Sequence, residues 1–155
     1  MLDVSRKTVR IGHAASGMLA ILLITAFLVT TVIVELSGNT PLITHVKQGI
    51  AYGVVVLIPT MIAIGLTGRR LAGTSQAPLI VRKRRQMVII AVNGLFILVP
   101  CALVLAWLAT MGSFGFTFAL LQGIELIAGG INLTLLVLTA KLGRQMTLRH
   151  RGKAV

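Results

Sequence analysis

The stretch LLQGIELIAGGINLTLLVL, from Leu120 to Leu138, is an apolar run with one carboxylate, Glu125, near its middle. A run of about 20 apolar residues can cross the hydrocarbon core of a bilayer as a helix. A carboxylate inside such a run is costly and is by default a candidate functional group. The stretch therefore predicts a membrane helix that carries a buried polar site.

The whole chain has the composition of a membrane protein. Of its 155 residues, 56% are hydrophobic and only 12% are charged, and the mean hydropathy is +0.96. An average soluble domain is about 25% charged, so this chain has too few polar residues to cover a surface that faces water. Its length favours one domain over residues 1–155, and lipid is the expected medium around most of it.

Four apolar runs are long enough to cross a bilayer, and a basic loop separates the second from the third. The runs cover about 11–34, 42–67, 87–110 and 114–140, and the loop covers about 68–86. Continuous runs favour helices, because the strands of a membrane barrel alternate apolar and polar residues. Short turns make neighbouring helices antiparallel, so the predicted fold class is an all-α, up-down four-helix transmembrane bundle.

The basic residues orient this bundle. All of the 15 Lys and Arg residues except Lys47 lie on one side of the predicted membrane. The positive-inside rule then places both termini and the middle loop in the cytoplasm. We expect these charges to meet anionic lipid headgroups, which accounts for the net charge of +12 without a nucleic-acid partner. The predicted location is a membrane, most simply the bacterial inner membrane.

The polar residues of each run gather on one helical face when successive residues advance by about 100°. The four predicted faces hold Gln122, Glu125, Gly129 and Asn132 in the fourth run; His45, Gln48, Gly49 and Tyr52 in the second; Gln86, Asn93, Ile97, Pro100 and Val104 in the third; and His13, Thr31 and Glu35 in the first. Matching their depths predicts two clusters inside the bundle. One joins Tyr52 and Glu125 to Gln48 and Gln122, and the other joins Asn93 to Asn132 nearer the cytoplasm.

Two interpretations of Glu125 stay open at this point. In the first, a neutral carboxyl bonds to Tyr52 or a glutamine and holds the helices in register, with an average contribution of about 0.6 kcal/mol per bond. In the second, the carboxyl carries a proton or binds a polar or cationic group. Burial favours the neutral form of the carboxyl unless an opposite charge pairs with it.

Small residues and prolines predict local packing. Gly49 and Gly53 form a GxxxG pair, and Gly129 lies on the polar face of the fourth run. Such glycines allow close helix approach, either inside the bundle or at a dimer interface. Pro59 and Pro100 each remove a backbone hydrogen bond and are expected to kink their helices.

His13 and His45 raise the alternative of a haem-binding redox subunit of the cytochrome b type, because membrane cytochromes use histidine ligands on facing helices. The two histidines fall at opposite ends of their runs, about 25 Å or more apart across a 30 Å core. One haem cannot bridge them within a chain, so a haem would need one histidine or two subunits.

The residues contain no set that is typical of catalysis or of a metal centre. Cys101 is the single cysteine, which excludes an internal disulfide. We therefore predict a protein that is not an enzyme: a small transporter-like or accessory membrane subunit, with a polar seam centred on Glu125. The alternatives are the haem subunit and a purely structural assembly partner, and a homo-oligomer or a larger membrane complex is possible.

Overall fold

The computed structural model describes residues 5–151, with side chains described up to residue 144, and this part of the chain contains no strand. The helices are α1 (Arg6–Ser37), α2 (Thr40–Ala72), α3 (Pro78–Asn93), η1 (Gly94–Leu98), α4 (Val99–Thr110) and α5 (Phe116–Arg151). Because α3, η1 and α4 are continuous, the chain folds into four long rods. Each rod is long and apolar enough to cross a membrane, as predicted.

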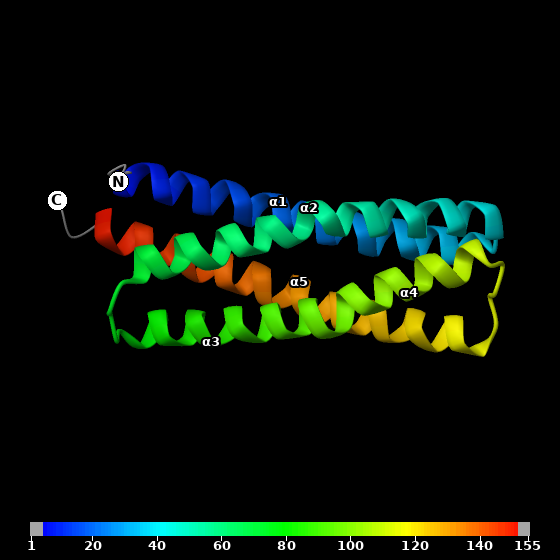
Figure 1. The fold of residues 1–155 in the computed structure, drawn as a ribbon. Helices are drawn as coiled ribbons and strands as arrows, with labels where there is room; N and C mark the ends of the chain where they lie inside the picture. Colours follow the sequence, from blue (N-terminus) through cyan, green and yellow to red (C-terminus); the bar gives the residue numbers. More distant parts are fainter. Residues whose placement is uncertain (1–4, 152–155) are drawn as a thin grey trace.

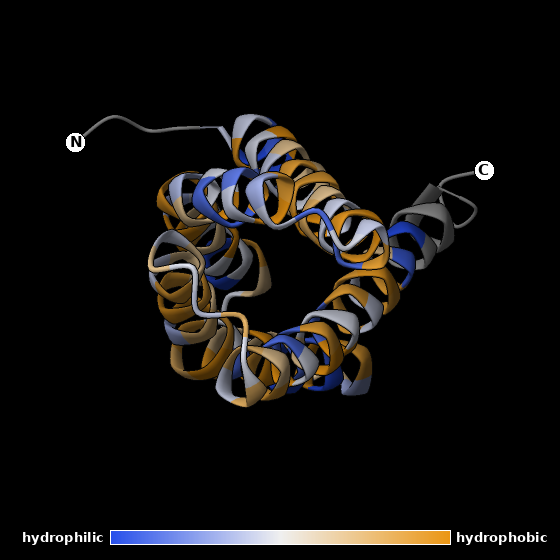
Figure 2. Cartoon of the chain, turned by 90° about the vertical axis from the view of Figure 1, so that its right-hand side faces the viewer, coloured by the Kyte–Doolittle hydropathy of each residue, from blue (hydrophilic) through white to orange (hydrophobic). Residues whose placement is uncertain are grey.

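Successive rods are antiparallel and pack side by side (Figure 1). The α2–α3 turn, the start of α1 and the end of α5 share one end, which we call the basic end. The α1–α2 and α4–α5 turns lie at the opposite end. Viewed from that end, the four rods surround the bundle axis (Figure 2). Large hydrophobic residues are exposed on every rod. An outward apolar surface is what a lipid environment requires.

The helices extend further than the apolar runs at the basic end. Most of the predicted loop 68–86 is helical, since α2 continues to Ala72 and α3 begins at Pro78, which leaves only residues 73–77 as the turn. The basic segment between the second and third apolar runs is therefore largely helical. Arg, Lys, Gln and Leu are good helix formers, so a helix need not end where its apolar run ends.

The turn at the opposite end is fixed by local chemistry. Gly38 adopts a left-handed conformation with φ of 63° and closes α1 through a bond from its N–H to the Glu35 carbonyl oxygen. Asn39 then caps α2, because its side-chain oxygen accepts a bond from the Leu42 N–H at 3.1 Å. Helices very commonly end on such a glycine and begin on such an asparagine. This turn holds α1 and α2 antiparallel and in contact along their length.

A π-helical turn breaks the regular spacing of the third rod. At η1 the Val99 N–H bonds to the Gly94 carbonyl oxygen, five residues back, directly before Pro100, which has no N–H to donate. The wider turn shifts the faces of α4 relative to α3, and Figure 1 shows the two segments at an angle. Asn93 faces inward as predicted, whereas Ile97 and Val104 are exposed, so the predicted single face of this rod was wrong from η1 onward.

The buried core lies between the rods in three layers. The layer at the basic end contains Ala20, Ile24, Ile64, Ile90 and Leu136; the middle layer contains Ile50, Val54 and Ala102; and the layer at the opposite end contains Val34, Ile43, Leu105, Ala109 and Phe118. Polar side chains of α5 are buried between these layers. The apolar layers thus hold the polar groups at fixed depths.

Candidate functional site

A buried ion pair joins α2 to α5. The Lys47 Nζ atom donates to the Glu125 Oε2 atom at 2.6 Å. Lys47 is 0% exposed and Glu125 is 8% exposed, so both charges are removed from the surroundings of the bundle. Taking two charges out of water costs several kcal/mol for each ion, and close pairing offsets that cost. This pair therefore joins α2 to α5 by electrostatic attraction as well as by packing.

Two further polar side chains surround the pair and are incompletely bonded. The Gln122 Nε2 atom donates to the same Glu125 oxygen at 3.3 Å. The Gln122 Oε1 atom and the Glu35 Oε1 atom are buried without a hydrogen-bond partner among the described residues. Glu35, on the last turn of α1, interacts electrostatically with both Lys47 and Glu125. Cys101 of α4 also lies within electrostatic range of the pair.

The balance of charge in this group of side chains is uneven. Of the two carboxylates, Glu125 alone forms an ion pair with Lys47, and Glu35 interacts with both groups electrostatically. When both carboxyls are ionised, one negative charge has no partner, and like charges that share a site favour the binding of a proton or of another cation. The two oxygens without partners are acceptors, which suits the same kind of ligand. We call Glu35, Lys47, Gln122 and Glu125 the charge cluster.

The predicted pairing of Glu125 with Tyr52 is wrong. Tyr52 is 78% exposed, and His45, Gln48 and Gly49 lie on the same exposed face of α2. Lys47 and Tyr52 are five residues apart and so project about 140° apart around the helix, which means that α2 cannot direct both at α5. Leaving an unpaired ammonium in lipid costs far more free energy than exposing a tyrosine. The orientation of α2 therefore buries Lys47 and exposes Tyr52.

On α5 every residue of the predicted face is buried, including Gln122, Glu125, Gly129 and Asn132.

The second predicted cluster, Asn93 with Asn132, is present. The Asn93 Nδ2 atom donates to the Asn132 Oδ1 atom at 2.8 Å and to the Ala128 carbonyl oxygen at 2.9 Å. The Asn132 Nδ2 atom donates to the Ile90 carbonyl oxygen at 3.3 Å. These bonds tie α3 to α5 at the point where η1 begins.

The glycines differ in what they contact. A Cβ atom on Gly53 would lie 2.4 Å from the Phe27 ring, and one on Gly129 would lie 2.9 Å from the Leu28 side chain. Both therefore allow close approach to α1, as their predicted packing role requires. A Cβ atom on Gly49 would meet nothing within 4 Å, so Gly49 packs against nothing inside the bundle.

The two histidines lie at opposite ends of the bundle and bond locally. His13 Nδ1 lies 2.9 Å from the Thr67 hydroxyl, near the basic end. His45 Nδ1 donates to the Pro41 carbonyl oxygen at 2.9 Å, near the other end. A haem bridging them inside one chain is excluded by this placement. Among the described residues, no three His, Cys, Asp or Glu side chains converge as a metal site would require.

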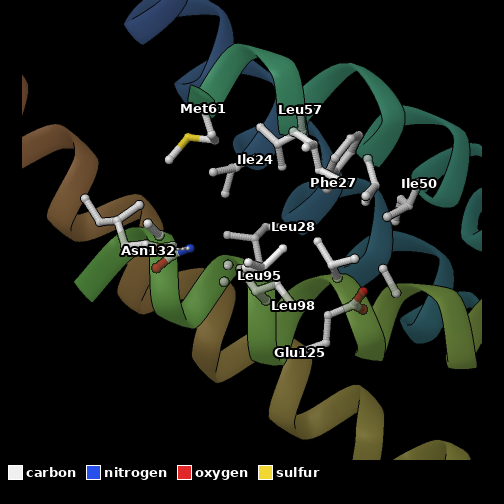
Figure 3. A pocket seen from close by; sticks show the side chains of 18 of the residues that line it. Ile24, Phe27, Leu28, Ile50, Leu57, Met61, Leu95, Leu98, Glu125 and Asn132 are labelled. Atoms are coloured by element: carbon white, nitrogen blue, oxygen red, sulfur yellow. Dashed lines mark hydrogen bonds between the residues drawn. The ribbon is translucent and has the colours of Figure 1, made fainter. Parts of the chain in front are cut away.

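An apolar cavity of about 410 Å³ lies beside the charge cluster. All four rods contribute to its lining, and the polar side chains that reach it are Thr31, Glu125 and Asn132. Figure 3 shows Glu125 toward one end of the space and Asn132 toward the other, with Leu28, Leu95 and Leu98 between them. Sites for small molecules are mainly apolar spaces of about 300–1,000 Å³ with a few placed polar groups, and this cavity fits that description.

Sequence reasoning missed Lys47, although a signal for it was present. Lys47 lies two turns into its helix from the opposite end, and Glu125 lies between two and three turns into α5 from the same end. Ionisable residues inside membrane helices pair with one another, so matched depth and opposite charge identify the pair.

Comparisons with known protein families, with curated proteins and with solved structures find no match for this chain.

Proposed function

We propose that this protein is a small transport protein of the bacterial inner membrane, with both termini in the cytoplasm. The observation that carries the proposal is the fully buried Lys47 bonded to Glu125, whose carboxylate also lines a cavity of ligand size. In this proposal the charge cluster binds and releases a proton or another cation during transport. The protein performs no covalent chemistry.

A purely structural role explains the pair less well than transport does. Buried ion pairs are weak contributors to stability, because apolar residues of similar volume are often equally stable or better. A cluster with two carboxylates, one ammonium and two acceptor atoms without partners is also a poor structural bridge. An acceptor-rich cluster at the edge of a cavity suits a group that must take up and release positive charge.

Proton flux into vesicles tests this proposal. Purified protein is reconstituted into liposomes, a potassium diffusion potential is imposed, and an internal pH dye reports proton entry. We expect Glu125→Gln to remove the flux and Tyr52→Phe, on the outward face of the neighbouring helix, to leave it unchanged. Equal rates in the wild type, in Glu125→Gln and in empty vesicles would refute proton transport.

The orientation has its own test. Thr74 in the α2–α3 turn and Ser113 in the α4–α5 turn are exposed at opposite ends of the bundle. Single-cysteine variants at these positions, in a Cys101→Ala background, are treated on intact cells with a thiol reagent that cannot cross membranes. The positive-inside rule predicts labelling at 113 in intact cells and at 74 only after permeabilisation. The reverse pattern would overturn the proposed orientation.

A second candidate function, as a subunit of an assembly, is favoured by the outward face of α2. His45, Gln48 and Tyr52 are all exposed there, and polar side chains that face acyl chains are rare unless another helix covers them. A second copy of this chain is the simplest cover, with Gly49 allowing close contact. Single-molecule photobleaching in lipid nanodiscs should show dimers that Gly49→Leu converts to monomers; monomers throughout would exclude this candidate.

A further inference from the structure

We infer that the cavity takes a lipophilic cation, and that this ligand enters sideways from the lipid layer. The inference rests on the proposed transport function and names its class of substrate. Three features of the structure carry it: the nature of the cavity wall, the place where the wall is open, and the sign of the charge at the cavity edge.

The wall of the cavity suits a bulky hydrocarbon body. Aliphatic side chains from every rod form it, together with the ring of Phe27 and the flexible thioether of Met61. Its volume of about 410 Å³ exceeds that needed for an inorganic ion and falls in the range of drug-sized molecules. A small hydrated cation would find few oxygen ligands here, because the lining contains three polar side chains, Thr31, Glu125 and Asn132.

The cavity is open between α2 and the third rod. Near the opposite end α2 packs on α4, but toward the basic end it touches α3 at few points and makes no close backbone approach to η1. Ile58 and Ile62 of α2 and Leu95 of η1 line the cavity and are exposed. An opening rimmed by such side chains admits molecules that are already dissolved in the bilayer.

The π-helical turn produces this opening. Gly94, Leu95 and Leu98 of η1 all line the cavity, and the bend between α3 and α4 separates this rod from α2 on one side. Single π turns inside α-helices occur frequently at functional sites. Within this turn the Val99 N–H still bonds to the Gly94 carbonyl oxygen.

The charge at the cavity edge selects a cation. Glu125 lines the cavity, whereas the Lys47 ammonium does not, and the Glu35 carboxyl interacts electrostatically with both groups. A cationic ligand at Glu125 would release Lys47 to pair with Glu35, so that two carboxylates face two positive charges. An anion would instead meet a net negative cluster, and like charge in a low-dielectric site is strongly unfavourable.

The same arrangement makes protons compete with the ligand. The ionisable groups that face Glu125 are Glu35 from α1, Lys47 from α2 and Cys101 from α4. When Glu35 or Glu125 binds a proton, the excess negative charge disappears and the attraction for the cation falls. Ligand and proton therefore bind in alternation, which couples the movement of one to the movement of the other.

Equilibrium binding to the purified full-length protein in lipid nanodiscs tests the inference. The probes are tetraphenylphosphonium and tetraphenylborate, which have the same shape and opposite charge. We expect saturable binding of the phosphonium, no saturable binding of the borate, and weaker phosphonium binding as the pH falls. Equal binding of both ions, or of neither, would overturn the inference.

Substitutions locate the binding. Glu125→Gln should weaken phosphonium binding more than tenfold, because it removes one member of a buried charge pair, while Glu125→Asp retains binding. Gly65 lines the cavity with open space beside it, and Gly12 also faces open space but lies outside the cavity. Gly65→Leu should therefore abolish phosphonium binding, and Gly12→Leu should not. Loss of binding in both variants, or binding that survives Gly65→Leu, would refute the site.

The two proposals fail separately. Proton flux that depends on Glu125 without binding of phosphonium would refute the substrate class and leave the transport function standing. Phosphonium binding that depends on Glu125 without proton flux would support the binding site and refute proton-coupled transport.

Discussion

Replacing Lys47 by methionine tests the ion pair most sensitively. Methionine retains an unbranched apolar chain but removes the ammonium, so Glu35 and Glu125 remain as two carboxylates without a cation. Opposite charges 2.6 Å apart attract by about 6 kcal/mol at an effective dielectric constant of about 20. Desolvation offsets part of that energy, and deleting one partner of a buried pair costs about 3–5 kcal/mol. We expect Lys47→Met to lower the free energy of unfolding by an amount in that range.

Glu125→Gln should cost less than Lys47→Met, because Lys47 then still has Glu35 nearby. The double variant Lys47→Met, Glu125→Gln should cost less than the sum of the two single changes, since only one carboxylate is left. Unfolding by SDS in mixed micelles measures all three free energies. Additive losses, agreeing within about 0.5 kcal/mol, would show that the two side chains do not interact and would refute the reasoning.

Two further changes probe helix packing. Gly53→Ala should be less stable than Gly49→Ala by about 1–3 kcal/mol, because only the first places a methyl group against Phe27, at 2.4 Å from its ring; equal unfolding free energies in SDS titrations would contradict this packing. Asn132→Leu should cost about 1–3 kcal/mol by leaving the Asn93 amide with one bond fewer, and Asn93→Leu in the same chain should recover part of that loss; a double variant that is less stable than the sum of the single ones would argue against the pairing.

The fold was predictable from the sequence because the hydrophobicity of membrane-length runs decides it. Apolar runs of membrane length, turn residues between them and the clustering of basic charge predict four antiparallel rods without reference to any side-chain contact. The face of α5 was also predictable, since Gln122, Glu125 and Asn132 recur at helical spacing on one side. The same spacing rule placed Asn93 opposite Asn132, and their hydrogen bond at 2.8 Å confirms that pairing.

Helical spacing predicted the wrong buried face in two of the rods. In the third rod, η1 changes the number of residues per turn, so faces counted through it are displaced. In α2, the predicted face is the one that gathers His45, Gln48 and Tyr52, and Lys47 lies on another face. Energy depends on the kind of polar group, and one ammonium in lipid costs more than several neutral polar groups.

The site itself was half predictable. Glu125 is identified by its isolation in an apolar run, and Gln122 by its position one turn away. Lys47 was predicted only as the one basic residue away from the cytoplasmic side, although its side chain is fully buried. The electrostatic proximity of Glu35 requires the packing of α1 against α2, which no single-helix argument supplies.

Cross-linking measures which face of α2 meets Glu125, and this is the most direct test of the account. Two cysteine pairs are compared in a Cys101→Ala background with a protease site in the turn at 73–77: Lys47→Cys with Glu125→Cys, and Tyr52→Cys with Glu125→Cys. After treatment with a short, membrane-permeant thiol cross-linker and cleavage, the first pair should hold the two halves together and the second should not. Cross-linking of the second pair alone would place Tyr52 at Glu125 and contradict the buried ion pair on which the site depends.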